Sequence, residues 1–89
     1  MSNAQQTIRQ EIIDWHSSYQ QANGLTPTQP ITCDGIEFWC VGHNSTHIFF
    51  VGTRDNRRFC FDSRLEDVGW IGSEIKEIEA FDDGYFGHF

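Results

Sequence analysis

The stretch that decides the fold is Ile36-Glu37-Phe38-Trp39-Cys40-Val41, followed a few residues later by Ile48-Phe49-Phe50-Val51. Both segments are short and rich in β-branched and aromatic residues, which predicts β-strands. A strand with one face in water carries apolar side chains on alternate residues only, because successive side chains point to opposite faces. Here bulky apolar side chains occupy both alternations. The sequence therefore predicts a sheet with two apolar faces, each of which needs a cover.

A helix is expected ahead of this sheet. Between residues 5 and 22 the apolar side chains recur at steps of three and four, which places them along one stripe of a helix. The stripe consists of Ile8, Ile12, Trp15, Tyr19 and Ala22. Asn23-Gly24 supplies a left-handed stop, and Pro27 and Pro30 keep the helix from restarting. A single helix of this kind can cover one of the two sheet faces.

Turn residues divide the segment from Ile31 to Asp62 into four strands. Asp34-Gly35 predicts a two-residue hairpin turn, since both central residues of such a turn need positive φ. Further chain reversals are expected in Gly42-His43-Asn44-Ser45 and around Asp55-Asn56. The alternation of side chains then defines the face that we expect the helix to cover. Its members are Ile31, Cys33, Ile36, Phe38, Cys40, Ile48, Phe50, Phe59 and Phe61.

The opposite face has too many apolar side chains to be left in water. Trp39, Val41, Phe49 and Val51 are neighbours on it, and full burial of each such side chain is worth roughly 1.5–3 kcal/mol. A contiguous apolar patch of this size usually marks an interaction site. We interpret these residues as an interaction face that is either shared by two copies of a homodimer or covered by the C-terminal part of the same chain. The C-terminal tail adds its aromatic residues to this predicted face: Tyr85, Phe86 and Phe89.

The residues after the sheet are ambiguous between helix and strand. Ser63-Arg64-Leu65-Glu66 fits a helix capping box, and the apolar residues that follow fall within one sector of a helix. We therefore predict a C-terminal helical segment, with a late edge strand as the alternative. The predicted fold class is α+β: an N-terminal helix packed on a four-stranded antiparallel meander, then the helical segment, in one domain over residues 5–89. Residues 1–4 are expected to be disordered or vector-derived, because Ser2-Asn3-Ala4 resembles a remnant of an expression vector.

The charge of the chain is negative and unevenly distributed. The 89 residues carry a net charge of −7, and residues 62–89 hold eight acidic against two basic side chains. Such a field disfavours nucleic acid and anionic membranes as partners and helps solubility. No segment approaches the ~20 consecutive apolar residues of a membrane-spanning helix. An acidic surface that meets a basic protein partner is the functional alternative to plain solvation.

The three cysteines form no C-x-x-C pair, and we expect reduced thiols in a cytoplasmic protein. Cys40, His43, His47 and Cys60 are the best candidates for a metal site, because thiolate and imidazole are zinc ligands. In the expected register, however, Cys40 and His47 point to opposite faces, and His43 lies in a turn. Our interpretation is buried thiols and loop histidines, with no metal and no cofactor.

The spacing of hydroxyls, thiols and histidines groups no nucleophile with a base and an orienting residue. No catalytic residue is therefore assigned, and we do not expect an enzyme. Arg54, Arg57 and Arg58 are interpreted as a charged hairpin tip rather than a nucleic-acid site. The sequence thus predicts a small acidic interaction module that forms a homodimer, with an inhibitor-type protein that neutralises a basic partner as one version. The alternative is a small-molecule binder whose aromatic-lined cavity favours apolar or cationic ligands.

Overall fold

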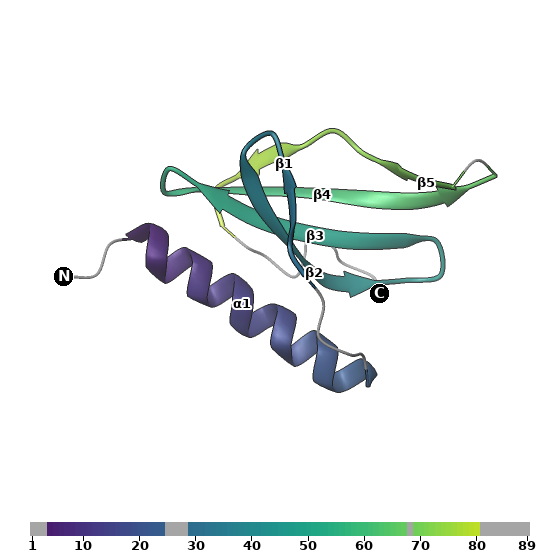
Figure 1. The fold of residues 1–89 in the computed structure, drawn as a ribbon, viewed down its shortest axis with the longest axis horizontal. Helices are drawn as coiled ribbons and strands as arrows, with labels where there is room; N and C mark the ends of the chain where they lie inside the picture. Colours follow the sequence, from purple (N-terminus) through teal and green to yellow (C-terminus); the bar gives the residue numbers. More distant parts are fainter. Residues whose placement is uncertain (1–3, 25–28, 68, 81–89) are drawn as a thin grey trace.

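The computed structural model describes residues 4–24, 29–67 and 69–80, which form one helix and an antiparallel sheet of six strands (Figure 1). The elements are α1 (Ala4–Asn23), β1 (Ile31–Cys33), β2 (Ile36–His43), β3 (His47–Arg54), β4 (Arg57–Glu66), β5 (Gly69–Gly72) and β6 (Lys76–Ile78). The strand order is β1-β2-β3-β4-β5, and β6 pairs with β4 beside β5. In this described part of the chain, no helix is both long and apolar enough to cross a membrane.

Helix α1 lies where the sequence predicts it. It begins at Ala4 and ends at Asn23, whose side-chain amide donates a hydrogen bond of 2.9 Å to the carbonyl oxygen of Tyr19. Gly24 follows with a φ of 64°, a left-handed conformation that glycine adopts without steric cost. Polar and charged residues fill the exposed side of the helix, so only its apolar stripe is available for packing.

Two hairpins confirm the predicted turns. Asp34 and Gly35 have φ values of 53° and 74°, and they set Cys33 opposite Ile36. The β3–β4 hairpin repeats this geometry at Asp55-Asn56, with φ values of 54° and 61°. Two successive residues with positive φ match the right-handed twist of the strands they join. These turns fix which side chains share a face of the sheet.

The helix covers the face that we expected to be open. Ile8 and Ile12 of α1 pack with Val41, Val51 and Cys60, and each of these five residues is at most 4% exposed. The residues packed around this helix-side cluster are Trp15, Trp39, Phe49 and Ile78. The prediction that α1 packs on the Ile36 and Phe38 face is therefore wrong.

The other sheet face carries a second, largely aromatic cluster. Phe38 meets Phe61 edge to face at 4.7 Å between ring centroids, and Phe50 stacks on Phe61 at 4.8 Å. Ile36 and Phe59 complete the buried set. In Figure 1, β1 and the start of β2 cross in front of β3 and β4, and Ile36 of β2 packs with Phe59 of β4. The sheet is therefore curled, and this face buries part of its apolar surface against itself.

The predicted C-terminal helical segment is wrong. Residues 69–72 and 76–78 form β5 and β6, and Ser63-Arg64-Leu65-Glu66 lies within β4 instead of starting a helix. β4 has an outer edge whose backbone N–H and C=O groups need partners, and these two strands supply them. Ile75 packs with the aromatic cluster and Ile78 with the helix-side cluster, as expected for a strand but not for one stripe of a helix. The late edge strand, held as the alternative, matches β6; Phe81 lies outside the described residues.

The first prediction concerns Gly52, at the centre of β3. A Cβ atom on Gly52 would lie 2.5 Å from the carbonyl oxygen of Glu37 and 2.9 Å from Phe38, so Gly52→Ala forces backbone to move. We expect a loss of about 1–3 kcal/mol in the free energy of unfolding, measured by urea denaturation. Gly72→Ala is the matched control, because its Cβ would meet only Phe61 at an ordinary 3.8 Å. Equal losses in the two variants would contradict the close strand contact.

Candidate interaction face

The predicted interaction face lies beneath α1 rather than at the surface. Trp39, Val41, Phe49 and Val51 are neighbours, as expected. Trp39 and Phe49 are half-buried and pack against the helix-side cluster, whereas Val41 and Val51 belong to it. Val51 is 0% exposed and Val41 is 3% exposed. In this structure they form part of the core, so a partner cannot reach Val41 or Val51 while α1 is in place. The remaining predicted members, Tyr85, Phe86 and Phe89, lie outside the described residues.

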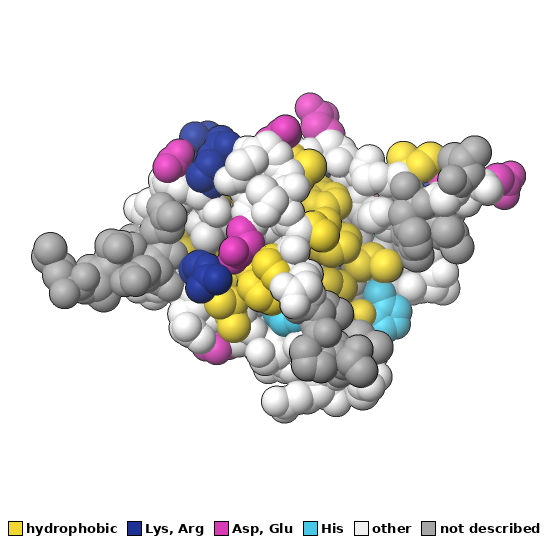
Figure 2. Space-filling view, viewed as in Figure 1, with side chains coloured by type: hydrophobic (Ala, Val, Ile, Leu, Met, Phe, Trp, Pro, Cys, Tyr) yellow, Lys and Arg dark blue, Asp and Glu magenta, His cyan; other side chains and the backbone are white. Residues whose placement is uncertain are grey.

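The face opposite α1 is the one that presents apolar side chains to solvent. We use the name open face for its exposed and half-buried members Ile31, Cys33, Ile48 and Phe50. Ile31 stands opposite Phe38 in the β1–β2 pairing and remains 44% exposed. Figure 2 shows hydrophobic side chains gathered in a band over the middle of the sheet, with the charged side chains around it. None of the four open-face residues carries a carboxylate, ammonium or guanidinium group.

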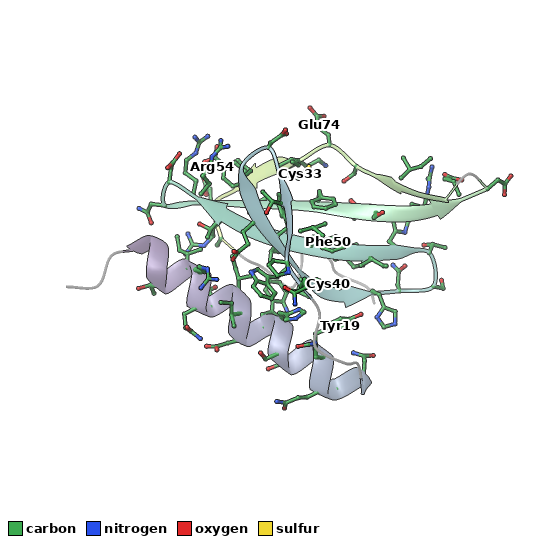
Figure 3. The ribbon with its side chains drawn as sticks, in the orientation of Figure 1. Tyr19, Cys33, Cys40, Phe50, Arg54 and Glu74 are labelled. Atoms are coloured by element: carbon green, nitrogen blue, oxygen red, sulfur yellow. The ribbon has the colours of Figure 1, made fainter. Side chains whose placement is uncertain are left out.

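Phe50 is the best-supported residue of the open face. It lies in the central strand β3 (Figure 3), and its ring stacks on Phe61 with an angle of 10° between the two planes. Phe61 is in turn held by the edge-to-face contact with Phe38. A half-buried aromatic side chain that is already fixed by neighbouring rings loses little conformational entropy when a partner covers it.

The candidate metal ligands are not gathered into one site. Cys60 is 0% exposed beneath α1, whereas His47 faces Asp62 at the other end of the sheet. Cys40 and His43 both lie near the C-terminal half of α1, where Tyr19 separates them. Among the residues that the structure describes, no three histidine, cysteine or acidic side chains converge as a metal site would require.

His16 closes part of the free edge of β2. Strand β1 pairs with β2 only as far as Phe38, so the next outward-facing backbone groups of β2 have no strand beside them. His16 Nδ1 lies 2.7 Å from the carbonyl oxygen of Cys40 and donates to it, because a carbonyl only accepts. The His16 ring is 4% exposed and lies 4.9 Å from the Trp39 ring. Sequence analysis missed this residue, although its position four residues after Ile12 placed it on the buried side of the helix.

Tyr19 links α1 to both Cys40 and His43 (Figure 3). Its hydroxyl lies 2.8 Å from His43 Nδ1. Burial, together with the neighbouring Cys40 sulfur, raises the pKa of Tyr19 to about 12. Burial also raises the pKa of the Cys40 thiol, although hydrogen bonding with the Gly42 backbone and the Tyr19 side chain partly opposes this rise. Both groups therefore keep their protons near neutral pH, which removes Cys40 as a thiolate nucleophile.

The arginines of the β3–β4 hairpin are engaged within the fold. The guanidinium groups of Arg54 and Arg57 lie 5.8 and 5.4 Å from the centre of the Phe59 ring. Arg54 also donates to the Asp34 carbonyl oxygen, and Arg57 donates from Nε to Glu77 at 2.7 Å. The Arg57 hydrogen bonds lower the pKa of the Glu77 carboxyl. These contacts tie the hairpin to β1 and β6.

No family model, no curated protein and no solved structure matches this chain.

The second prediction concerns the reactivity of the thiols. Cys33 is exposed, Cys40 is half-buried with a raised pKa, and Cys60 is buried. Because the thiolate is the reactive form, we expect iodoacetamide at pH 7.5, applied to highly dilute monomeric protein, to label Cys33 first, Cys40 much more slowly and Cys60 only in denaturant. Mass spectrometry of peptides taken over time measures the three rates. Labelling of Cys40 as fast as Cys33 in the native protein would show that Cys40 is neither shielded nor held as a thiol.

Proposed function

We propose that this protein is a small acidic interaction module, without an enzymatic activity of its own, that forms a homodimer through the open face. The observation that carries the proposal is the half-buried Phe50, set between Ile48 and the aromatic cluster on a sheet face that α1 does not cover. An apolar face of this kind favours association because it removes more apolar surface from water.

The contacts among the Phe50, Phe61 and Phe38 rings favour a protein as the partner of the open face. Interfaces draw most of their binding energy from a few fixed aromatic or large apolar side chains near their centre. Phe50 has this character because Phe61 and Phe38 hold its ring from below. Ile31 and Ile48 lie on the same face, so they can exclude water around such a centre.

The open-face residues themselves carry no charge, and this favours a second copy of this chain as the partner. The charged side chains on the same side of the sheet lie at its hairpin end, where Arg54 and Arg57 contact the Phe59 ring and Arg57 pairs with Glu77. In a twofold dimer the same patch of the two copies comes into contact, so a charged residue in the patch would lie near the same charge on the other copy. Ile31, Cys33, Ile48 and Phe50 avoid this conflict. The net charge of −7 still makes two copies repel at longer range, but salt screens that repulsion beyond a Debye length of about 8 Å.

The thiols support a reducing compartment, and we propose the cytoplasm. All three cysteines are free, and Cys33 is exposed on the open face. Secreted proteins of this size usually rely on disulfides to compensate for a small core.

The third prediction compares two exposed isoleucines on opposite faces. Ile31 on the open face is 44% exposed, and Ile71 on the other face is 48% exposed. Ile31→Asp places a charge in the proposed contact, so we expect light scattering to give a dimer mass for the parent protein and a monomer mass for this variant. Ile71→Asp should remain a dimer. Circular dichroism of both variants verifies the fold, and Ile48→Asp serves as a second test if Ile31→Asp unfolds. A monomeric parent protein at all concentrations would refute the dimer.

The fourth prediction uses salt to separate a second copy from a basic partner. Two copies of charge −7 repel, so the dimer should tighten as the salt concentration rises. Binding of a basic protein to the same acidic chain should weaken under these conditions. Sedimentation equilibrium at low and high salt measures the dissociation constant. A dimer that weakens with salt would show that ion pairs, and not the apolar face, hold it together.

A further inference from the structure

A small polar pocket lies on the opposite side of the sheet from the open face. It has a volume of about 240 Å³ and is partly lined by residues of β5. Strand β5 lies at the right-hand end of the sheet in Figure 1. Its walls are His47, Asp62, Arg64, Ile71, Gly72 and Ser73. Strand pairing sets His47 opposite Arg64 and Arg64 opposite Ile71, so these side chains share one face of the sheet. The proposed dimer contact involves none of them.

The hydrogen bonds around Asn44 and Thr46 lead us to assign the ring proton of His47 to Nδ1. Asn44 Oδ1 accepts hydrogen bonds from the backbone N–H of Thr46 and of His47, at 2.9 and 2.8 Å. The same oxygen accepts the Thr46 hydroxyl proton at 3.1 Å. Thr46 Oγ1 lies 2.6 Å from His47 Nδ1, and with the hydroxyl proton directed to Asn44 we assign Nδ1 as the donor to Thr46 Oγ1. In the neutral ring the other nitrogen, Nε2, is then an acceptor.

This acceptor faces a second acceptor across the pocket. His47 Nε2 lies 3.7 Å from Asp62 Oδ2, which is longer than a hydrogen bond but short enough for one donor to reach both atoms at about 2.9 Å. Ser73 Oγ lines the same pocket and accepts the backbone N–H of Asp62 at 2.9 Å. A primary ammonium group, with its three N–H donors and positive charge, fits this group of acceptors.

Arg64 restricts which cation can bind. It occupies the next position on the same face of β4, about 6.6 Å along the strand from Asp62, and it forms an ion pair with Glu66. A simple cation would be repelled by this guanidinium. A ligand that also carries a carboxylate would instead be attracted, because a guanidinium has five N–H donors and can bind a second carboxylate beside Glu66. Ile71 adds an apolar wall that is 48% exposed.

We propose that this pocket binds a small zwitterion with a primary ammonium group and a carboxylate, of the class of α-amino acids with an apolar side chain. The ammonium group lies between His47 and Asp62, the carboxylate lies against Arg64, and the side chain packs on Ile71. No covalent step is involved. The site does not depend on the homodimer.

The experiment is a titration of the full chain at pH 8, followed by the ¹⁵N and ¹H signals of the histidine rings. L-Leucine is the probe; isoamylamine carries the same side chain and the ammonium group alone, and 4-methylpentanoate carries the carboxylate alone. We expect leucine to shift the His47 signals along a saturable curve, and each single-charge analogue to bind at least about tenfold more weakly, which corresponds to about 1.4 kcal/mol.

Two matched variants locate the binding. Asp62→Asn keeps the size of the side chain and removes the charge that holds the ammonium group, so leucine should no longer shift His47. Asp55→Asn is the control, because Asp55 is exposed at the far hairpin and pairs with Arg54; leucine should bind this variant as it binds the parent protein. The proposal is overturned if leucine leaves the His47 signals unmoved, if Asp62→Asn binds leucine unchanged, or if isoamylamine binds as tightly as leucine.

Discussion

The packing of one helix on one of two apolar sheet faces is the constraint on which the rest of this structure depends. α1 has a single apolar stripe, so it can bury Ile8 and Ile12 against only one face. Each of these isoleucines contributes roughly 1.5–3 kcal/mol when it leaves water. His16 and Tyr19 of α1 form hydrogen bonds with Cys40 and His43 near the end of β2. These hydrogen bonds fix the orientation of the helix on the sheet. Because α1 packs on the face that contains Val51, the aromatic side chains of the opposite face are buried only by one another or by a binding partner.

Shape explains which face the helix takes. Val41, Val51 and Cys60 are small, and together they offer a shallow surface on which a helix can lie closely. The opposite face carries Phe38, Phe59 and Phe61, which fill the concave side of a curled sheet. Gly52 allows this curl, because it leaves room for Phe38 to approach the centre of β3. Aromatic side chains thus bury one another on the concave side, whereas Ile8 and Ile12 of the helix pack on Val41, Val51 and Cys60, with Trp39 and Phe49 around them.

Much of this fold could be predicted from the sequence, because helix periodicity and turn chemistry act over a few residues. The stripe of α1 and the turns at Asp34-Gly35 and Asp55-Asn56 are signals of this local kind. The face that α1 covers is a different matter, since both alternations of β2 and β3 are apolar and no pattern distinguishes them. The bulge between Cys40 and Gly42, which leaves Val41 without its own partner in β3, also lacks a local signal. The C-terminal strands were missed for the same reason: the unpaired edge of β4 is a feature of the assembled sheet.

The candidate sites, like the fold, depend partly on signals within a few residues and partly on contacts that exist only in the folded sheet. The acidic C-terminal part suggests a charged binding surface, but two of its carboxylates form ion pairs with basic side chains: Glu66 with Arg64 and Glu77 with Arg57. Exposed ion pairs of this kind add little stability, typically 0–1 kcal/mol, but they neutralise charge where they lie. This pairing weakens the argument for an inhibitor that works by charge alone and strengthens the argument from apolar surface. Strand β4 also sets two opposite charges, Asp62 and Arg64, on the same face of the sheet, with His47 of β3 opposite Arg64. The proposed zwitterion matches this alternation, because its ammonium group can lie against Asp62 while its carboxylate lies against Arg64.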